Sequence, residues 1–432
     1  MSKKVRPSVA APKFVVKLMV LAVLSGWPYA AGAQSVDNIV QWHRIMLTAL
    51  AVPGANPATV FATRPLAITS AAIYDAANSF DRLYDPYTTW FTPASGASRD
   101  AAVAQAAHDA LVALLPSQTS AFDAALATSL AGIAPQAAAD GAAVGAAAAR
   151  ATLERRTGDG WERPFPPLVL PNLPGYWKPT PPANVVAQFT NYPDVVGFIV
   201  DNGRHFMIEG PPALTSARYA TDFNQVKSWG SATSTVRSAE QTQISNLWAG
   251  VGTTTNVNFV WNNLVATVAQ GQGWSGVETA RAYALLNMTM HDALMTSFTG
   301  KFTYGLWRPV TAVREADNDG NDATAGDPNW LPLLTTPPYP SAPGNMACIG
   351  ASMSRTMERL VGRDNLPFSV TWTGAGTNPA VTRSYNGFRQ LADEEAYSRI
   401  WGGIHFLFET LSSLGQCSRI GDYAVDNVLR RR

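Results

Sequence analysis

The sequence is poor in the residues from which most metal and nucleotide sites are built. Its 432 residues include two cysteines and five histidines, and only 15% of the residues are charged. It contains no zinc-ligand cluster and no glycine-rich nucleotide-binding motif. The formal net charge is +1 and basic residues do not gather into a block, so we expect no nucleic-acid partner.

Long apolar runs are also scarce. An apolar run at residues 18–24 follows five basic residues with no acidic one among them, and small residues at 31–33 precede Gln34. The run is far shorter than the roughly 20 residues that a membrane-spanning helix needs. This pattern is typical of a secretory signal peptide at residues 1–33. We therefore expect cleavage before Gln34, export to the periplasm or the extracellular space, and no membrane span in the mature chain.

The remaining sequence favours helices over strands. Alanine is abundant, and few segments alternate with the two-residue period of a strand, so we expect an all-α protein. The predicted helices cover residues 36–52, 64–80, 98–115, 117–133, 136–156, 216–229, 239–249, 256–270, 277–298, 346–361, 387–396 and 420–429. Pro65 is expected in the first turn of its helix, where proline is tolerated. Ser238 with Gln241 and Ser275 with Glu278 match the capping box that begins many helices.

A proline-dense segment at residues 158–212 interrupts the helical pattern. Proline lacks an amide donor and ends the helix before it, so this segment should contain no long helix. It is either a linker or an ordered cover packed on the C-terminal half, and its aromatic residues favour the cover. The mature chain then consists of an N-terminal helical half at residues 34–157, this linker or cover, and a C-terminal helical half at residues 213–432. The alanine-rich helical surface permits a homodimer.

Two stretches of the C-terminal half carry cations among apolar and aromatic residues. The first holds Lys301 and Arg308, the second holds Arg399 and His405, and neither contains an acidic residue. Lysine supplies a point charge, arginine a planar fork of donors, and histidine a nitrogen that can bond covalently or to a metal. Together they indicate a receptor for a compact oxyanion. The alternative is that the three cations pair with carboxylates elsewhere in the fold.

The order of these motifs is lysine, six residues, Arg-Pro, a proline-rich loop, and then Ser-Arg, five residues and histidine. It resembles the vanadium-dependent haloperoxidases and type 2 phosphatidic acid phosphatases, in particular the bacterial chloroperoxidase-like branch. The resemblance implies two packed helical bundles around a site for vanadate or phosphate. It also implies that Lys301, Arg308 and Arg399 bind the oxygens of the anion. His405 would bond to vanadium or, in a phosphatase, attack phosphorus. For a haloperoxidase, the further partners are peroxide and a halide or an organic acceptor.

The loop between the two stretches departs from the pattern of that superfamily. Its members carry Pro-Ser-Gly-His or a close variant, whose histidine is the general acid and base, whereas this loop reads Pro343-Gly344-Asn345-Met346. In this alignment Gly344 replaces the serine, Asn345 the glycine and Met346 the histidine. The other register starts from Pro340 and puts Pro343 at that position. A thioether takes up no proton at ordinary pH. Its presence should therefore slow both the haloperoxidase reaction and the phosphatase reaction.

We therefore expect a secreted haloperoxidase-like protein that binds vanadate or phosphate and has reduced or altered halide peroxidase activity. The two alternatives are a non-catalytic phosphate- or vanadate-binding protein and an acid phosphatase that acts through a phosphohistidine at His405. In each case Gly344 and Asn345 help the three cations to bind the anion.

The other histidines have ordinary structural explanations. His43 and His108 are predicted to be satisfied interhelix or surface histidines. His291 precedes Lys301 by about 15 Å of helix, at 1.5 Å per residue, which is too far to replace the missing acid and base.

Two further features remain. The acidic cluster at residues 317–322 lacks the EF-hand spacing and predicts a surface turn rather than a calcium site. Cys348 and Cys417 either form a disulfide in the exported protein or remain two small buried thiols.

Overall fold

The computed structural model describes residues 31–55 and 59–432. The predicted signal peptide at residues 1–33 lies outside the described residues except for its last three positions, which begin the first helix. The described part is mainly helical, which confirms the expected fold class, and contains one two-stranded sheet. No helix within it is long and apolar enough to cross a membrane.

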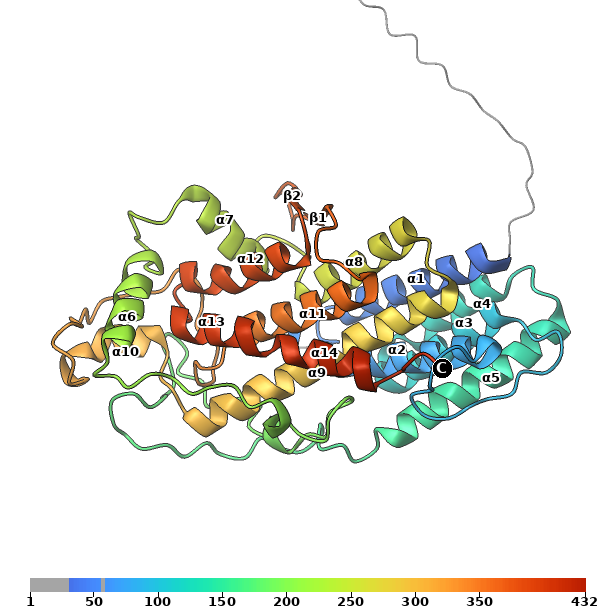
Figure 1. Cartoon of the computed structure of the whole chain (residues 1–432), viewed down its shortest axis with the longest axis horizontal. Helices are drawn as coiled ribbons and strands as arrows, with labels where there is room; N and C mark the ends of the chain where they lie inside the picture. The colour runs from blue at the N-terminus through green and yellow to red at the C-terminus, as the bar shows by residue number, and fades with distance from the viewer. Residues whose placement is uncertain (1–30, 56–58) are drawn as a thin grey trace, which may run out of the picture.

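The first helices of the chain gather at one end of the elongated molecule (Figure 1). They are α1 (Ala31–Leu50), α2 (Thr59–Asp81), α3 (Arg99–Leu114), α4 (Thr119–Leu130) and α5 (Pro135–Arg155). Helix α3 packs against both α2 and α5. Gly145 of α5 approaches α3 so closely that an added Cβ would overlap the carbonyl oxygen of Ala102. Small side chains therefore allow the close helix packing that the alanine-rich sequence indicated.

The C-terminal half is organised around α9 (Gly276–Tyr304), the longest helix of the described chain. Almost every residue of α9 as far as Lys301 is buried, because α9 packs against α2 of the N-terminal half and against α11. The surrounding helices are α6 (Ala217–Trp229), α7 (Ala239–Trp248), α8 (Val257–Gln272), α10 (Pro309–Glu315), α11 (Asn345–Val361), α12 (Phe388–Trp401), α13 (Leu407–Gln416) and α14 (Ser418–Asn427). Both predicted capping boxes are present, at the starts of α7 and α9.

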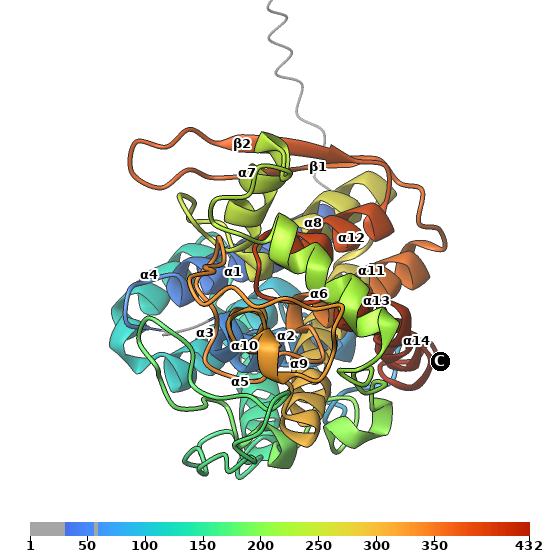
Figure 2. The same ribbon diagram turned by 90° about the vertical axis from the view of Figure 1, so that its left-hand side faces the viewer.

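The small sheet is an antiparallel hairpin of β1 (Phe368–Trp372) and β2 (Val381–Tyr385), with Phe368 opposite Tyr385. It lies along one face of the molecule beside α7 (Figure 2). The ring of Trp372 packs edge to face on Trp248 at the end of α7, with the ring centroids 5.4 Å apart. These strands were not predicted, although the residues of Phe368–Trp372 alternate between apolar and polar as they do in a half-buried strand.

Residues 158–212 contain only short 3-10 turns, η2 (Tyr192–Asp194) and η3 (Gly203–Phe206). Their backbone is held by the C-terminal half. The amides of Phe198, Ile199 and Val200 donate to the buried carboxylate of Asp292 in α9. The amide of Trp177 donates to the carbonyl of Gly305 at 2.7 Å. The segment therefore lies over α9 instead of extending away from it.

Four details differ from the sequence-based expectation. Helix α9 continues to Tyr304, so Lys301 lies in its last turn rather than beyond its exit. Pro65 lies inside α2 rather than in its first turn, because α2 already begins at Thr59; the packing of α2 outweighs the missing amide. Helices α10 and α13 were not predicted, since both are short and follow irregular loops.

The two cysteines are joined. The Cys348–Cys417 disulfide links α11 to the junction between α13 and α14. Of the two possibilities for these cysteines, a disulfide or two small buried thiols, the structure shows the disulfide.

Candidate oxyanion site

Lys301 is a fully buried cation at the end of α9. Helix α9 stops three residues after Lys301 because Gly305 adopts a left-handed conformation, with φ of 59°. The Lys301 ammonium donates hydrogen bonds to the carbonyl oxygens of Ser341 and Pro343 in the proline-rich loop. Burial, together with the nearby charge of Arg308, lowers the pKa of Lys301 well below its ordinary value. A bound anion would offset both effects.

Arg308 is the residue that precedes α10, and its guanidinium is fully buried. Nε donates to the carbonyl oxygen of Tyr339 at 2.9 Å, and Nη1 donates to that of Ile404 at 2.8 Å. Nη1 also lies 3.1 Å from Nε2 of His405. Nη2 is buried and has no hydrogen-bond partner among the described residues. The side chain thus ties both motif stretches together and retains one unused donor group.

Arg399 lies in the last turn of α12. Burial lowers the pKa of its guanidinium to about 10, so the group is still charged at neutral pH. Its Nε and Nη1 atoms are buried, and nothing in the described part of the chain accepts a hydrogen bond from either. Glu395, one helical turn earlier, does not compensate this charge fully, because burial raises the pKa of its carboxyl well above the ordinary value. Arg399 is therefore a fixed cation in need of an acceptor.

His405 follows the turn at Gly402 and Gly403, where α12 ends. Gly403 has a φ of 77° and packs so closely on Gly230 that a side chain would not fit. Burial lowers the pKa of His405 to about 3, with the charges of Arg308 and Lys301 acting in the same direction. The imidazole is therefore neutral at pH 7.

Glu409 of α13 is the acidic partner of His405. Its Oε2 lies 3.1 Å from Nδ1 of His405, at ion-pair distance, and its other oxygen accepts hydrogen bonds from Ser341 Oγ and the Phe406 amide. Burial acts to raise the pKa of Glu409, but His405, Lys301 and Ser341 hold it below its ordinary value. The carboxylate thus favours the tautomer with the proton on Nδ1, which leaves Nε2 unprotonated and facing Nη1 of Arg308.

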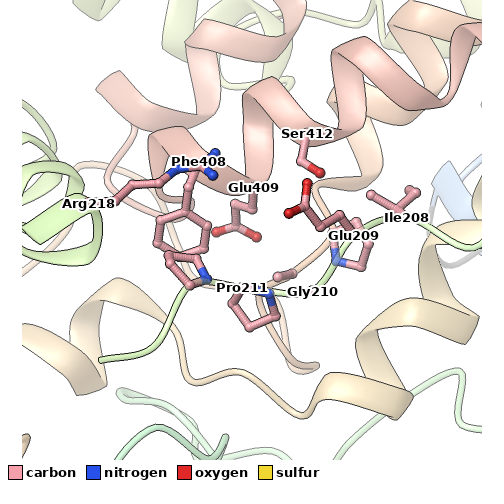
Figure 3. A pocket seen from close by; sticks show the side chains of 11 residues that line it. Ile208, Glu209, Gly210, Pro211, Arg218, Phe408, Glu409 and Ser412 are labelled. Atoms are coloured by element: carbon pink, nitrogen blue, oxygen red, sulfur yellow. The ribbon is translucent and has the colours of Figure 1, made fainter. Parts of the chain in front are cut away.

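A narrow cleft reaches Glu409 from the surface between residues 208–212 of the cover and Phe408 (Figure 3). Sequence reasoning missed Glu409. The available signal was its position four residues after His405, which places two side chains on the same face of a helix when the intervening residues are helical.

A cavity of about 230 Å³ lies on another side of His405. Its wall includes Tyr339, Asn345, Met346, Arg399 and His405. The structure therefore brings together most of the residues that the sequence singled out. The Lys301 ammonium instead donates to the loop carbonyls. It acts on the residues of the cavity wall through its positive charge and through the neighbouring Arg308.

The loop residues are fixed by neighbouring helices. Asn345 is the first residue of α11 and its side-chain oxygen accepts from Ser297 of α9 at 2.6 Å. The Gly344 amide donates to Ser413 Oγ at 3.1 Å. A Cβ added to Gly344 would meet only ordinary contacts, among them His405 Nδ1 at 3.9 Å. Position 344 therefore has room for a small side chain that faces the histidine.

Tyr339 is a second residue that sequence reasoning missed. Its ring centroid lies 5.4 Å from Lys301 Nζ and 5.0 Å from Arg308 Cζ, so one aromatic ring contacts both cations. Burial raises the pKa of its phenol, which therefore stays a neutral donor. Its place in the Pro-rich loop between the two cationic stretches was the only hint in the sequence.

The remaining histidines agree with the expectations. His43 is buried and stacks on Tyr283 with the ring centroids 3.6 Å apart. His108 lies between Asp109 and Asp123. His291 is buried in α9, ten residues or almost three helical turns before Lys301, with Nδ1 3.3 Å from the Thr63 hydroxyl.

The acidic cluster at residues 317–322 forms a turn. Asp319 accepts hydrogen bonds from the Asn321 amide and from the Thr324 hydroxyl, and Asp317 accepts from the Gly326 amide. Within the described residues, no three His, Cys, Asp or Glu side chains are grouped in a way that could hold a metal ion directly.

Known proteins resemble this chain in both sequence and fold. Residues 281–432 match the model of the VCPO second helical-bundle domain. Vanadium chloroperoxidase from Curvularia inaequalis is 26% identical over 289 residues, which are 52% of this chain and 46% of that protein. The chain thus spans about half the length of this curated relative.

Solved structures extend the likeness to nearly the whole fold. A bacterial vanadium-dependent iodoperoxidase superposes with a TM-score of 0.75 at 21% identity, covering 94% of this chain and 98% of that one. The holo form of a bacterial vanadium-dependent chloroperoxidase superposes with a TM-score of 0.68 at 16% identity, covering 87% and 93%. The family model, the relative and the fold agree with one another. Residues 281–432 therefore resemble the VCPO second helical-bundle domain in sequence, and the chain as a whole has the helical-bundle fold of the solved vanadium-dependent iodoperoxidase and chloroperoxidase.

Proposed function

We propose that this protein binds a tetrahedral oxyanion, vanadate or phosphate, and that its vanadate form oxidises halide with peroxide at a reduced rate. The main support is the set of buried guanidinium nitrogens on Arg308 and Arg399 that lack partners within the described residues. A buried donor without a partner costs about 1–3 kcal/mol. Arginine forks bind the oxygens of phosphate-like anions especially well, so an oxyanion removes this cost.

Each residue has its own task. Arg308 and Arg399 bind the anion oxygens through their unpaired donors, Lys301 contributes its charge, and the unprotonated Nε2 of His405 would bond to vanadium. Glu409 retains the proton on Nδ1 and fixes the ring. Bound vanadate supplies the activation of peroxide for transfer of one oxygen atom to a halide or an organic acceptor. The loop carbonyls and Tyr339 keep the cations in place before the anion arrives.

Met346 accounts for the reduced rate. It lines the cavity next to His405 and Arg399, which supports its alignment with the acid and base histidine of the superfamily. A thioether can neither deliver nor accept a proton during the reaction. The loss of such a group typically slows a reaction by a factor of about 10² to 10⁴, or about 3 to 5 kcal/mol in the barrier. We therefore infer an intact anion site with a weak catalyst.

One observation favours a second candidate, an acid phosphatase. A neutral imidazole whose far nitrogen contacts a carboxylate is a competent nucleophile toward phosphorus. The leaving group would depart without a proton from position 346, so only activated esters such as aryl phosphates would react. Burst release of the phenol and a phosphohistidine at His405 would identify this activity.

Titration calorimetry with vanadate and with phosphate tests the anion site directly. Arg399→Ala should weaken the binding of both vanadate and phosphate. The control variant Arg355→Ala should bind both anions normally, because Arg355 pairs with Glu358 and Asp422 on the outer surface of α11. Iodide, bromide and chloride oxidation with vanadate and peroxide then measures turnover. Binding without any turnover indicates a non-catalytic anion-binding protein, and failure of both anions to bind contradicts the proposal.

We also propose that residues 1–33 direct export. Protein recovered outside the cytoplasm should begin at or near Gln34 by mass spectrometry. An intact Met1 on that protein would contradict the proposal.

A further inference from the structure

Two methionines of the described chain, Met207 and Met346, are partly exposed. Met346 lines the cavity that also contains His405 and Arg399. Met207 follows η3 in the cover segment and is absent from the wall of that cavity. The other described methionines are fully buried, namely Met46, Met288, Met290, Met295, Met353 and Met357. Met346 is thus the only methionine among the described residues that shares a solvent-reachable space with the anion site.

A thioether is a good acceptor of oxygen from an activated peroxide. Methionine is oxidised to the sulfoxide in one two-electron step, and access to the oxidant controls how readily this occurs. Holding two reactants in one cavity raises their effective concentration far above that in free solution. Arg399 and His405 of the proposed anion site and the thioether of Met346 meet this condition, because all three line one cavity of about 230 Å³.

We propose that Met346 is itself an oxygen acceptor of this site and becomes methionine sulfoxide when the protein works with vanadate and peroxide. The step transfers one oxygen atom from hydrogen peroxide to the sulfur. The O–O bond breaks, an S=O bond forms, the sulfur loses two electrons, and the peroxide is reduced to one molecule of water. This inference rests on the proposed function, because it requires vanadate to activate peroxide in the cavity.

The modification has a structural consequence. Sulfoxide formation converts an apolar, flexible side chain into a polar one with a strong acceptor oxygen. Buried donors of Arg399 lie in the same cavity wall and lack partners in the described chain. Each protein molecule accepts a single oxygen atom at this position, so the reaction is self-limiting and competes with halide only in the first turnovers.

The test compares Met346 with Met207 inside the same molecules. Full-length protein is treated with peroxide alone, with peroxide and vanadate, and with peroxide and phosphate, and peptide mass spectrometry measures the sulfoxide fraction at both positions. The ratio of Met346 oxidation to Met207 oxidation should rise about tenfold or more with vanadate, because only Met346 lies at the site. Phosphate should give no rise. Arg399→Ala should abolish the rise with vanadate.

Vanadate binding is measured by calorimetry on the same sample, which separates two kinds of failure. If vanadate binds and the ratio stays at its value with peroxide alone, this inference is wrong and the proposed anion site survives. If vanadate does not bind, the inference is wrong, and if phosphate does not bind either, the proposed function is wrong as well. A rise that persists in Arg399→Ala would show oxidation by free vanadate and peroxide in solution, and would also overturn the inference.

Discussion

Oε2 of Glu409 lies 3.1 Å from Nδ1 of His405, while Nε2 of the same ring lies 3.1 Å from Nη1 of Arg308. The imidazole is therefore held between a carboxylate and a guanidinium. Burial keeps the ring neutral, and the carboxylate decides which nitrogen carries the proton. This relationship makes the protonation of His405 a property of the folded state that can be measured.

The pH dependence of stability should reflect His405. Its folded pKa of about 3 lies below the roughly 6.5 of an unfolded histidine, so between these values the unfolded chain binds one more proton. Comparison of the wild type with His405→Gln by urea unfolding should show the wild type gaining relative stability as the pH rises from about 5 to about 6.5. The gain has an upper limit of about 1.4 kcal/mol per pH unit and should level off above about pH 6.5. A difference that does not change with pH would mean that His405 is not buried as a neutral ring.

The two arginines should separate binding from stability. Arg308→Ala removes two hydrogen bonds to the carbonyls of Tyr339 and Ile404, so it should lower the free energy of unfolding by about 2 kcal/mol or more. Arg399→Ala removes a guanidinium whose Nε and Nη1 have no partner within the described chain, so it should cost much less stability. Each variant should lose about tenfold or more in phosphate affinity. Denaturant unfolding and calorimetry measure the two effects. Equal destabilisation by both variants would contradict the assignment of Arg399 as the unpaired cation.

Restoration of a proton-transfer group should raise the activity. Met346→His should increase vanadate-dependent halide oxidation by up to about 10² to 10⁴ if the ring is well placed. A buried histidine also needs a partner, which the double variant Gly344→Ser, Met346→His supplies. Position 344 has room for the serine, because an added Cβ meets nothing closer than Ala347 at 3.7 Å.

The single variant Gly344→Ser is the matched control for the double variant, since it adds the hydroxyl without the ring. Steady-state halide oxidation at saturating vanadate measures all three variants. If Met346→His and the double variant bind vanadate as tightly as the parent and oxidise halide no faster than Gly344→Ser, then Met346 does not occupy the position of the catalytic histidine.

The disulfide should contribute strongly to stability. Cys348 and Cys417 are 69 residues apart, and closing a loop of this length stabilises a fold by about 4 kcal/mol in the chain-entropy model. The double variant Cys348→Ala, Cys417→Ala should therefore unfold at lower urea concentration than the oxidised wild type. The comparison is made with and without reductant, and reductant should have no effect on the variant. A wild type that is equally stable in reductant would contradict the prediction.

The sequence alone determined the helical class, most helix positions and the identity of the cations. Helix starts were predictable because a local pattern encodes them, as the capping boxes at Ser238 and Ser275 illustrate. Helix ends were less certain. The end of α9 lies beyond the predicted residue because tertiary burial, rather than local preference, carries the helix on to Tyr304.

Only the tertiary structure decided how the motifs combine. Arg308 and His405 are 97 residues apart, and their contact depends on how the chain returns after the hairpin and α12. Glu409 and Tyr339 carry no signature of their own, and their roles arise from the neighbours that folding gives them. Burial is also a property of the assembled fold. It changes the pKa of Lys301, Arg399 and His405 because charge is costly away from water, and no linear pattern of residues records that cost.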